Sequence, residues 1–192
     1  ITEGLVGSEM CIRDSAYGDR YPDYMLLSCV QESAKGGESV LIDGYRIEQY
    51  LQTHPDFSWA GHALADVVID QTEDNMQAAL SPIIMSNGHG RKMVRKTLNQ
   101  KPSPTSTDSE RDARMIALWC DTINAAYEVA PRFKLRAGQT LVVDNYRLMH
   151  GRDPYEDLQR MLWRVWVWTT DALGVPDLPL ASDTRHAAAS QN

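Results

Sequence analysis

Short apolar runs, separated by glycines and polar turns, recur along most of this chain and predict strands. Residues 25–31 and 38–44 are two such runs, and the second ends at a glycine. Asn87 and Gly88 lie between two further runs and predict a hairpin, because both residues tolerate positive φ. The other runs that predict strands are residues 65–71, 80–86, 91–98, 133–145 with a glycine turn inside, and 160–169.

Two segments have helical spacing instead. Residues 45–54 are amphipathic and stop before a proline, and residues 107–130 predict one long helix. Thr107 and Glu110 have the spacing of a capping box, which predicts that the long helix starts there. Its apolar face consists of Ile116, Trp119, Ile123 and Tyr127. Many short strands with one long helix predict a mainly β fold of the α+β class, a jelly roll or barrel with helical decoration.

Composition narrows the class of protein. The 192 residues are enough for one domain, and 43% hydrophobic with 23% charged residues is ordinary for a globular protein. A net charge of −7 without a long basic run argues against nucleic acid and against an anionic membrane. No apolar run approaches the roughly 20 residues that span a bilayer. The three cysteines, Cys11, Cys29 and Cys120, have neither the spacing of a zinc site nor that of a disulfide framework, which predicts a cytoplasmic location. The sequence leaves a homodimer possible.

The informative motifs are "GGESVLIDGY" at residues 36–45 and "LRAGQTLVVDNYRLMHGRDPYEDLQRMLWR" at residues 135–164. Together they resemble the iron(II)/2-oxoglutarate dioxygenases of the TauD/TfdA superfamily, nearest the branch of γ-butyrobetaine and trimethyllysine dioxygenases. The resemblance extends over roughly residues 16–170. It implies a double-stranded β-helix (jelly roll), with Fe(II), 2-oxoglutarate and O2 acting on a small-molecule substrate.

By this resemblance His150 is the distal histidine of the iron site. Such a site holds iron with two histidines and one carboxylate and leaves positions open for oxygen and cosubstrate. His150 follows an apolar strand, and we expect Asp144 and Asn145 to hold the turn before it. The alternative is an ordinary hydrogen-bonded surface histidine.

Arg160 and Arg164 are four residues apart in an apolar run, so on a strand they share a face. Charged groups that face a barrel interior are costly unless paired, and a dicarboxylic cosubstrate supplies the pair. The resemblance implies that Arg160 binds the distal carboxylate of 2-oxoglutarate and that Ser39 adds a hydroxyl. Arg164 would reach the other end of the cosubstrate or an anionic substrate group, and the two roles can be exchanged. Arg152 lies nearer the turn and is expected to matter less. The alternatives are a salt bridge on the outer face and a plain strand serine.

Aromatic residues are the candidates for a substrate pocket. Trp166 and Trp168 share the face of the two arginines and are, with Tyr17, the first candidates for substrate binding. The further candidates are Trp163 and Tyr24. A trimethylammonium group would gain about 0.5–2 kcal/mol per aromatic face. Packing in the core or on the sheet is the alternative for each of them.

The other two iron ligands of the family come as "H-T-D" before the first core strand. Counted back without gaps, that motif falls on Ile12, Arg13 and Asp14. Residues 5–15, "LVGSEMCIRDS", resemble a translated sequencing adapter. We therefore expect a non-native segment at residues 1–15, an N-terminally truncated, partial oxygenase domain at 16–172 and a poorly ordered C-terminal tail at 173–192.

The sequence thus predicts the C-terminal fragment of an oxygenase that hydroxylates a betaine- or amino-acid-like small molecule. The fragment itself is expected to be inactive, because the HxD metal motif is missing. Two alternatives stay open. One is a non-catalytic jelly-roll module that binds a small carboxylate, and the other is a structural remnant without a ligand.

Overall fold

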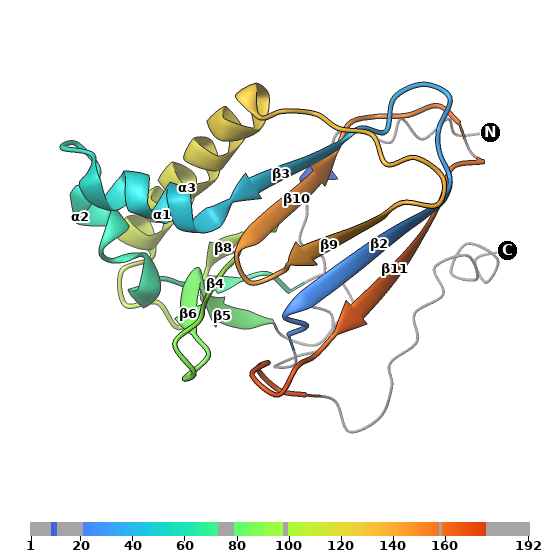
Figure 1. Ribbon diagram of the computed structural model, residues 1–192. Helices are drawn as coiled ribbons and strands as arrows, with labels where there is room; N and C mark the ends of the chain where they lie inside the picture. Colours follow the sequence, from blue (N-terminus) through green and yellow to red (C-terminus); the bar gives the residue numbers. More distant parts are fainter. Residues whose placement is uncertain (1–8, 11–20, 73–78, 98–99, 158, 176–192) are drawn as a thin grey trace, which may run out of the picture.

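Two antiparallel three-stranded sheets form the centre of the computed structural model, which describes residues 9–10, 21–72, 79–97, 100–157 and 159–175. In the first sheet, β10 (Leu148–Arg152) lies between β1 (Glu9–Met10) and β3 (Ser39–Asp43). In the second, β2 (Tyr24–Gln31) lies between β11 (Met161–Val167) and β9 (Thr140–Asp144). Figure 1 shows the strands of both sheets side by side, with the helices gathered beyond β3.

The pleat of the first sheet separates a core face from a second face. Val40, Ile42 and Met149 are buried in the main hydrophobic core. Their neighbours along the same strands point the other way, because successive side chains on a strand alternate between faces. The face opposite the core is the one that carries His150.

Helices cover the core face of this sheet. They are α1 (Gly44–Thr53), which contacts β10, and α3 (Ser109–Val129), which contacts β3. The short α2 (Ser58–Gly61) packs on α1, and the 3-10 turn η1 (Leu64–Asp66) contacts the short strands that follow it. The core between α3 and the strands includes Leu51, Leu64, Met115, Ile116, Trp119 and Ile123. The long helix is confirmed, but the predicted capping box is wrong. Asp108 is the N-cap, and its Oδ1 accepts the backbone N–H of Arg111 at 2.9 Å. An aspartate at that position reaches the orphan N–H with a short side chain, so the helix starts one residue later than predicted.

Short strands complete the described part of the chain. β4 (Val68–Asp70) lies between β5 (Leu80–Pro82) and β8 (Lys101–Pro102), and β6 (Ile84–Ser86) pairs with β7 (Lys92–Val94). The hairpin at Asn87 is confirmed, although its loop is longer than two residues. Asn87 Oδ1 accepts the backbone N–H groups of His89 at 2.9 Å and of Arg91 at 3.0 Å, which closes the loop.

Three strand predictions need correction. Residues 80–86 are two strands, because the run changes its partner at Ile83: Leu80–Pro82 pairs with β4, and Ile84–Ser86 pairs with β7. In residues 91–98, the described strand is Lys92–Val94 alone. At residues 133–135 only Phe133 pairs, through an isolated bridge to Ser39, before the chain turns toward Gly138.

Some expectations fall outside the described residues. They concern the segment at residues 1–15 apart from Glu9 and Met10, the side chain of Tyr17, and the tail from residue 176 onward. Among the helices that the structure does describe, none is both long enough and apolar enough to cross a bilayer.

Candidate functional site

A cavity of about 210 Å³ is lined by residues of both central sheets. The first sheet contributes Ser39, Val40, Leu41, His150, Gly151 and Arg152. The second sheet and the residue just before β11 contribute Met25, Leu27, Leu141, Arg160, Leu162 and Arg164. One histidine, three arginines and a serine are therefore set in a wall of apolar side chains, an arrangement typical of a site for a small polar ligand.

Strand register brings the polar groups of the first sheet together. Residue pairing in β10 and β3 places His150 opposite Leu41 and Arg152 opposite Ser39. Directly opposed residues point to the same face, and residues two apart on one strand do so as well. His150, Arg152 and Ser39 consequently lie on one face, and Ser39 is buried.

The two predicted arginines of β11 also share a face. Arg160 and Arg164 both line the cavity, with Leu162 between them. The register shift between Met161 and Leu162 leaves this alternation intact, because the extra residue is on β2. Both arginines therefore lie at the cavity, as the spacing of four residues predicted, and their roles stay a prediction. Arg160 is half-buried and Arg164 more exposed.

The positive charge at Arg152 and Arg160 is not neutralised by the nearby acidic residues. Asp153 accepts the Tyr127 hydroxyl at 2.9 Å and lies 3.4 Å from Arg132, and Asp157 accepts two backbone N–H groups. Within the described part of the chain, no carboxylate lies within 4.0 Å of either guanidinium group. Burial, followed by the charge of Arg152, lowers the pKa of Arg160. Among the described residues, Arg152 and Arg160 thus lack a carboxylate partner, and their charge favours an anionic ligand.

Two glycines of the "GGES" motif let the loop before β3 close on Arg160. Gly36 and Gly37 have φ values of +75° and +76°, which favour glycine. The N–H of Gly37 donates to the carbonyl of Pro154 at 3.1 Å. A Cβ on Gly37 would lie 3.1 Å from the Nε of Arg160, so a side chain there would crowd the guanidinium group.

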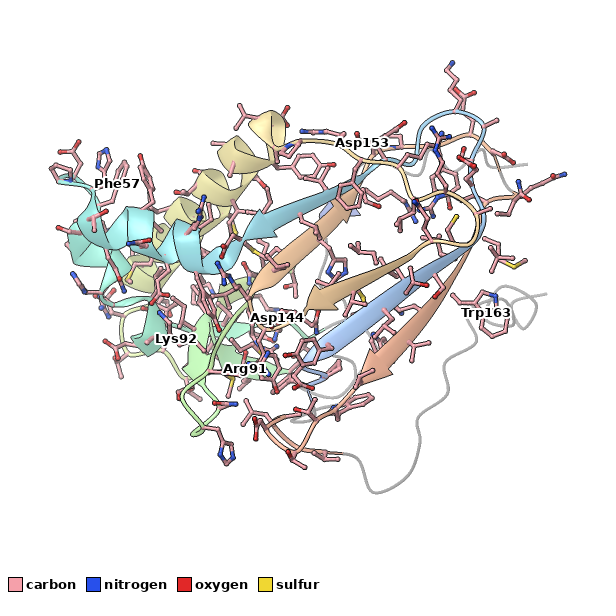
Figure 2. All side chains as sticks on the ribbon, viewed as in Figure 1. Phe57, Arg91, Lys92, Asp144, Asp153 and Trp163 are labelled. Carbon is pink, nitrogen blue, oxygen red and sulfur yellow. The ribbon has the colours of Figure 1, made fainter. Side chains whose placement is uncertain are left out.

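The turn before His150 is held as expected. Asp144 Oδ1 accepts the backbone N–H of Tyr146 at 3.1 Å, and the side-chain amide of Asn145 donates to the carbonyl of Pro22 at 2.9 Å. Sequence reasoning missed Arg91, which binds Asp144 at 2.9 Å and the buried Asp23 at 3.0 Å. Figure 2 shows Arg91 next to Asp144 at this end of the strands.

The predicted aromatic residues stand apart from the cavity wall. Trp166 and Trp168 are not among its lining residues, although the Arg164 guanidinium lies 4.6 Å from the Trp166 ring centroid. The two tryptophan rings meet edge to face at 6.4 Å. Trp163 is 59% exposed and points outward beyond β11 (Figure 2). Tyr17 lies outside the described residues.

The described residues fit an anionic cosubstrate but do not by themselves make up an iron site. Within the ranges that the structure describes, no group of three histidine, cysteine, aspartate or glutamate side chains could hold a metal ion. His150 is a single imidazole at the cavity, whereas a facial iron site needs two histidines and a carboxylate.

Comparison with known proteins defines the class of protein. The profile of the "Taurine catabolism dioxygenase TauD, TfdA family" matches residues 13–166. The chain therefore belongs to this family, whose oxygenases use iron(II) and 2-oxoglutarate. The expectation from the sequence motifs is confirmed.

Two curated relatives are γ-butyrobetaine dioxygenases. The human enzyme is 29% identical over 145 residues, which are 70% of this chain and 37% of the relative. The enzyme of Pseudomonas sp. strain AK-1 is 24% identical over 142 residues, which are 70% of this chain and 36% of the relative. The chain thus spans little more than a third of the length of these relatives.

Solved structures of lower identity share the fold. A crystal structure of asparagine oxygenase matches with a TM-score of 0.64 at 18% identity, covering 88% of this chain and 55% of the other. A taurine dioxygenase from Burkholderia xenovorans matches with a TM-score of 0.61 at 18% identity, covering 96% and 66%. The mixed α+β architecture with several antiparallel sheets is therefore the fold of these oxygenases.

Proposed function

We propose that this chain is the C-terminal part of an iron(II)/2-oxoglutarate-dependent oxygenase that hydroxylates a betaine- or amino-acid-like small molecule. The observation that carries the proposal is the set of Ser39, His150, Arg160 and Arg164 on one cavity. A dicarboxylic oxoacid would supply the negative charge that Arg160 lacks among the described residues. Guanidinium groups suit this task because they bind carboxylates through two parallel hydrogen bonds.

Each residue has a separate part in this proposal. Arg160 binds the distal carboxylate of 2-oxoglutarate, and the buried hydroxyl of Ser39 donates to it. Arg164, at the more exposed end of the wall, reaches the other end of the cosubstrate or an anionic group of the substrate. His150 is one protein ligand of the iron. Trp166, Trp168 and Tyr17 remain candidates for substrate binding, next to the cavity rather than in its wall.

In the bound state, iron and 2-oxoglutarate supply the oxidising power: O2 is consumed, the oxoacid becomes succinate and CO2, and one C–H bond of the substrate becomes C–OH. The protein contributes position and exclusion of water. Leu27, Leu41 and Leu141 line the same cavity, and in this proposal their apolar side chains limit the access of solvent to the bound cosubstrate. A cytoplasmic location and the truncation before residue 16 belong to the same proposal.

A second candidate is a non-catalytic module that binds a small carboxylate. It needs the same arginines but no metal, and the single described imidazole at the cavity favours it to that extent. The two candidates differ in their need for the residues that precede Tyr21. An oxygenase requires an "H-x-D" motif there in the parent protein, whereas a binding module does not.

The test of the anion site is calorimetric titration of the chain with 2-oxoglutarate without metal. Removal of one partner of a buried ion pair costs about 3–5 kcal/mol, and Arg160 is only half-buried, so the lower end applies. We expect Arg160→Gln to weaken binding by roughly two orders of magnitude, at about 1.4 kcal/mol per decade. Arg160→Lys should restore only part of the loss, because an ammonium group cannot make the two-point contact.

Arg114→Gln is the matched control, because Arg114 lies on α3 with a 61% exposed side chain and pairs with Glu110. It removes one positive charge far from the cavity and should leave the affinity unchanged. Equal affinity of Arg160→Gln, Arg114→Gln and the unmodified chain would overturn the assignment of this wall to the cosubstrate.

A further inference from the structure

Tyr155 contacts two cationic side chains that line the cavity. Its ring centroid is 4.6 Å from the guanidinium carbon of Arg152 and 5.0 Å from that of Arg160. Both arginines line the cavity, whereas Tyr155 itself does not. A single half-buried ring therefore contacts two like charges, one on β10 and the other just before β11.

We propose that Tyr155 is a positioning residue that holds Arg152 and Arg160 together as a two-arginine receptor for the distal carboxylate of a dicarboxylic oxoacid. This inference rests on the proposed function and deepens it. It adds Arg152 to the anion site and assigns Tyr155 an indirect role through the two guanidinium groups.

The electrostatics explain why a ring in contact with both arginines matters. Two guanidinium groups without a carboxylate partner repel each other and would move apart before a ligand arrives. The negative faces of an aromatic ring attract cations, so the ring offsets part of this repulsion in the free protein. The arginines then need less rearrangement when an anion binds, and preorganisation of this kind increases affinity.

The backbone fixes Tyr155 in the required place. Tyr155 pairs with Gly36 through an isolated β-bridge, and the carbonyl of the preceding Pro154 accepts the N–H of Gly37. A Cβ on Gly37 would lie 3.4 Å from the Cβ of Tyr155, so the same loop packs against the side chain. The loop between β10 and β11 is thereby anchored to the loop that precedes β3.

Arg152 reaches the same ligand from the first sheet. It stands directly opposite Ser39 in the β10–β3 pair, and Ser39 also lines the cavity. A carboxylate held by Arg160 from the second sheet would therefore meet Arg152 and Ser39 from the first.

The test is metal-free calorimetric titration of the full chain with 2-oxoglutarate, using Tyr155→Leu, Tyr155→Phe and Arg152→Gln, with the melting temperature of each variant. Tyr155→Leu removes the ring and should weaken binding roughly 3- to 30-fold. Tyr155→Phe keeps the ring and should stay within about twofold of the unmodified chain. Arg152→Gln should weaken binding at least as much as Tyr155→Leu.

Tyr50→Leu on α1 is the control, since Tyr50 is 46% exposed and lies outside the cavity wall. The proposal is overturned if Tyr155→Leu binds normally, or if Tyr155→Phe loses as much affinity as Tyr155→Leu. If Tyr155→Leu does not fold, normal affinity of Arg152→Gln overturns it. Loss of binding in Arg160→Gln with normal binding in the Tyr155 and Arg152 variants defeats this inference alone. Normal binding in Arg160→Gln defeats the proposed function as well.

Discussion

Gly37 and Arg160 are 123 positions apart in the sequence, yet a Cβ on the glycine would lie 3.1 Å from the Nε of the arginine. The side chain of Arg160 therefore occupies the space that any larger residue at position 37 would need. This contact links the first family motif, "GGES", to the arginine just before β11. It also means that the glycine shapes the anion site without offering a polar group.

Gly37→Ala should reduce both the stability and the affinity for 2-oxoglutarate. A residue with a Cβ at φ +76° costs about 1–2 kcal/mol. The new methyl group also pushes against Arg160, so we expect roughly tenfold weaker binding, or about 1.4 kcal/mol. Urea unfolding and metal-free titration measure the two effects separately.

Gly88→Ala is the control that introduces backbone strain without any contact to Arg160. Gly88 has φ +78°, and a Cβ there would meet nothing within 4 Å. It should lose a similar amount of stability to Gly37→Ala and keep full affinity for 2-oxoglutarate. If both variants bind equally well, Gly37 does not constrain Arg160.

The Asp43–Arg147 pair predicts a pH dependence of stability. Asp43 caps α1 and accepts Arg147 Nε at 3.1 Å. Burial alone would raise the pKa of Asp43, but the hydrogen bonds and charge of Arg147 and the backbone N–H groups of Tyr45 and Arg46 lower it. The folded-state pKa is below the unfolded value of about 3.9, so this stabilisation is complete well above that value. It decreases as the pH falls below about 5 and is lost as the pH falls through the folded-state pKa.

Asp43→Asn should therefore lower stability at pH 7 and flatten its decline below pH 4. An asparagine still caps the helix, so the change isolates the charge. Asp56→Asn, at a side chain that is 80% exposed, serves as the control. Urea unfolding between pH 2.5 and 7 gives the comparison, and parallel curves for Asp43→Asn and the unmodified chain would contradict the prediction.

The sequence was most informative where local pattern and family motif coincide. The period of two in residues 160–164 predicted that Arg160 and Arg164 share a face, and the same period on β10 aligns His150 with Arg152. Arg152 was expected to matter less because it is near a turn. Its position opposite Ser39 depends on the register between two distant strands, which no local pattern contains.

Other features depend on contacts that are remote in sequence. The bridge from Arg91 to Asp23 and Asp144 joins three segments, and Tyr155 meets Arg160 only because two loops close on each other. The helix start was missed by one residue because Thr107 and Asp108 are both good caps and only geometry decides between them. Trp166 and Trp168 are an even number of residues from the two arginines, which predicted a place on the same face. They are nevertheless not among the lining residues, because the cavity does not extend that far along the chain.

Removal of residues 1–15 should leave the melting temperature unchanged. The sequence of this segment has neither a helix face nor strand alternation, and of its residues the structure describes the pair Glu9–Met10, which pairs with Gly151 and Arg152. Limited proteolysis followed by calorimetry measures the effect. A loss of several degrees after trimming would show that the segment is integral to the first sheet.

The last prediction concerns turnover. With added Fe(II), the 192-residue chain should not convert 2-oxoglutarate to succinate, because the family's "H-T-D" positions fall on Ile12, Arg13 and Asp14. His150 alone would leave most iron positions to water, and a facial site needs three protein ligands. Replacing residues 1–15 with the genomic segment that precedes Ala16 in the parent gene should restore decarboxylation if that segment contains "H-x-D". His150→Ala in the restored protein should abolish metal-dependent turnover, while metal-free titration should still detect 2-oxoglutarate at the arginines.

Turnover by the unrestored chain that disappears in its own His150→Ala variant would contradict the prediction. A restored protein that contains "H-x-D" and binds 2-oxoglutarate without any turnover would favour the non-catalytic carboxylate-binding module.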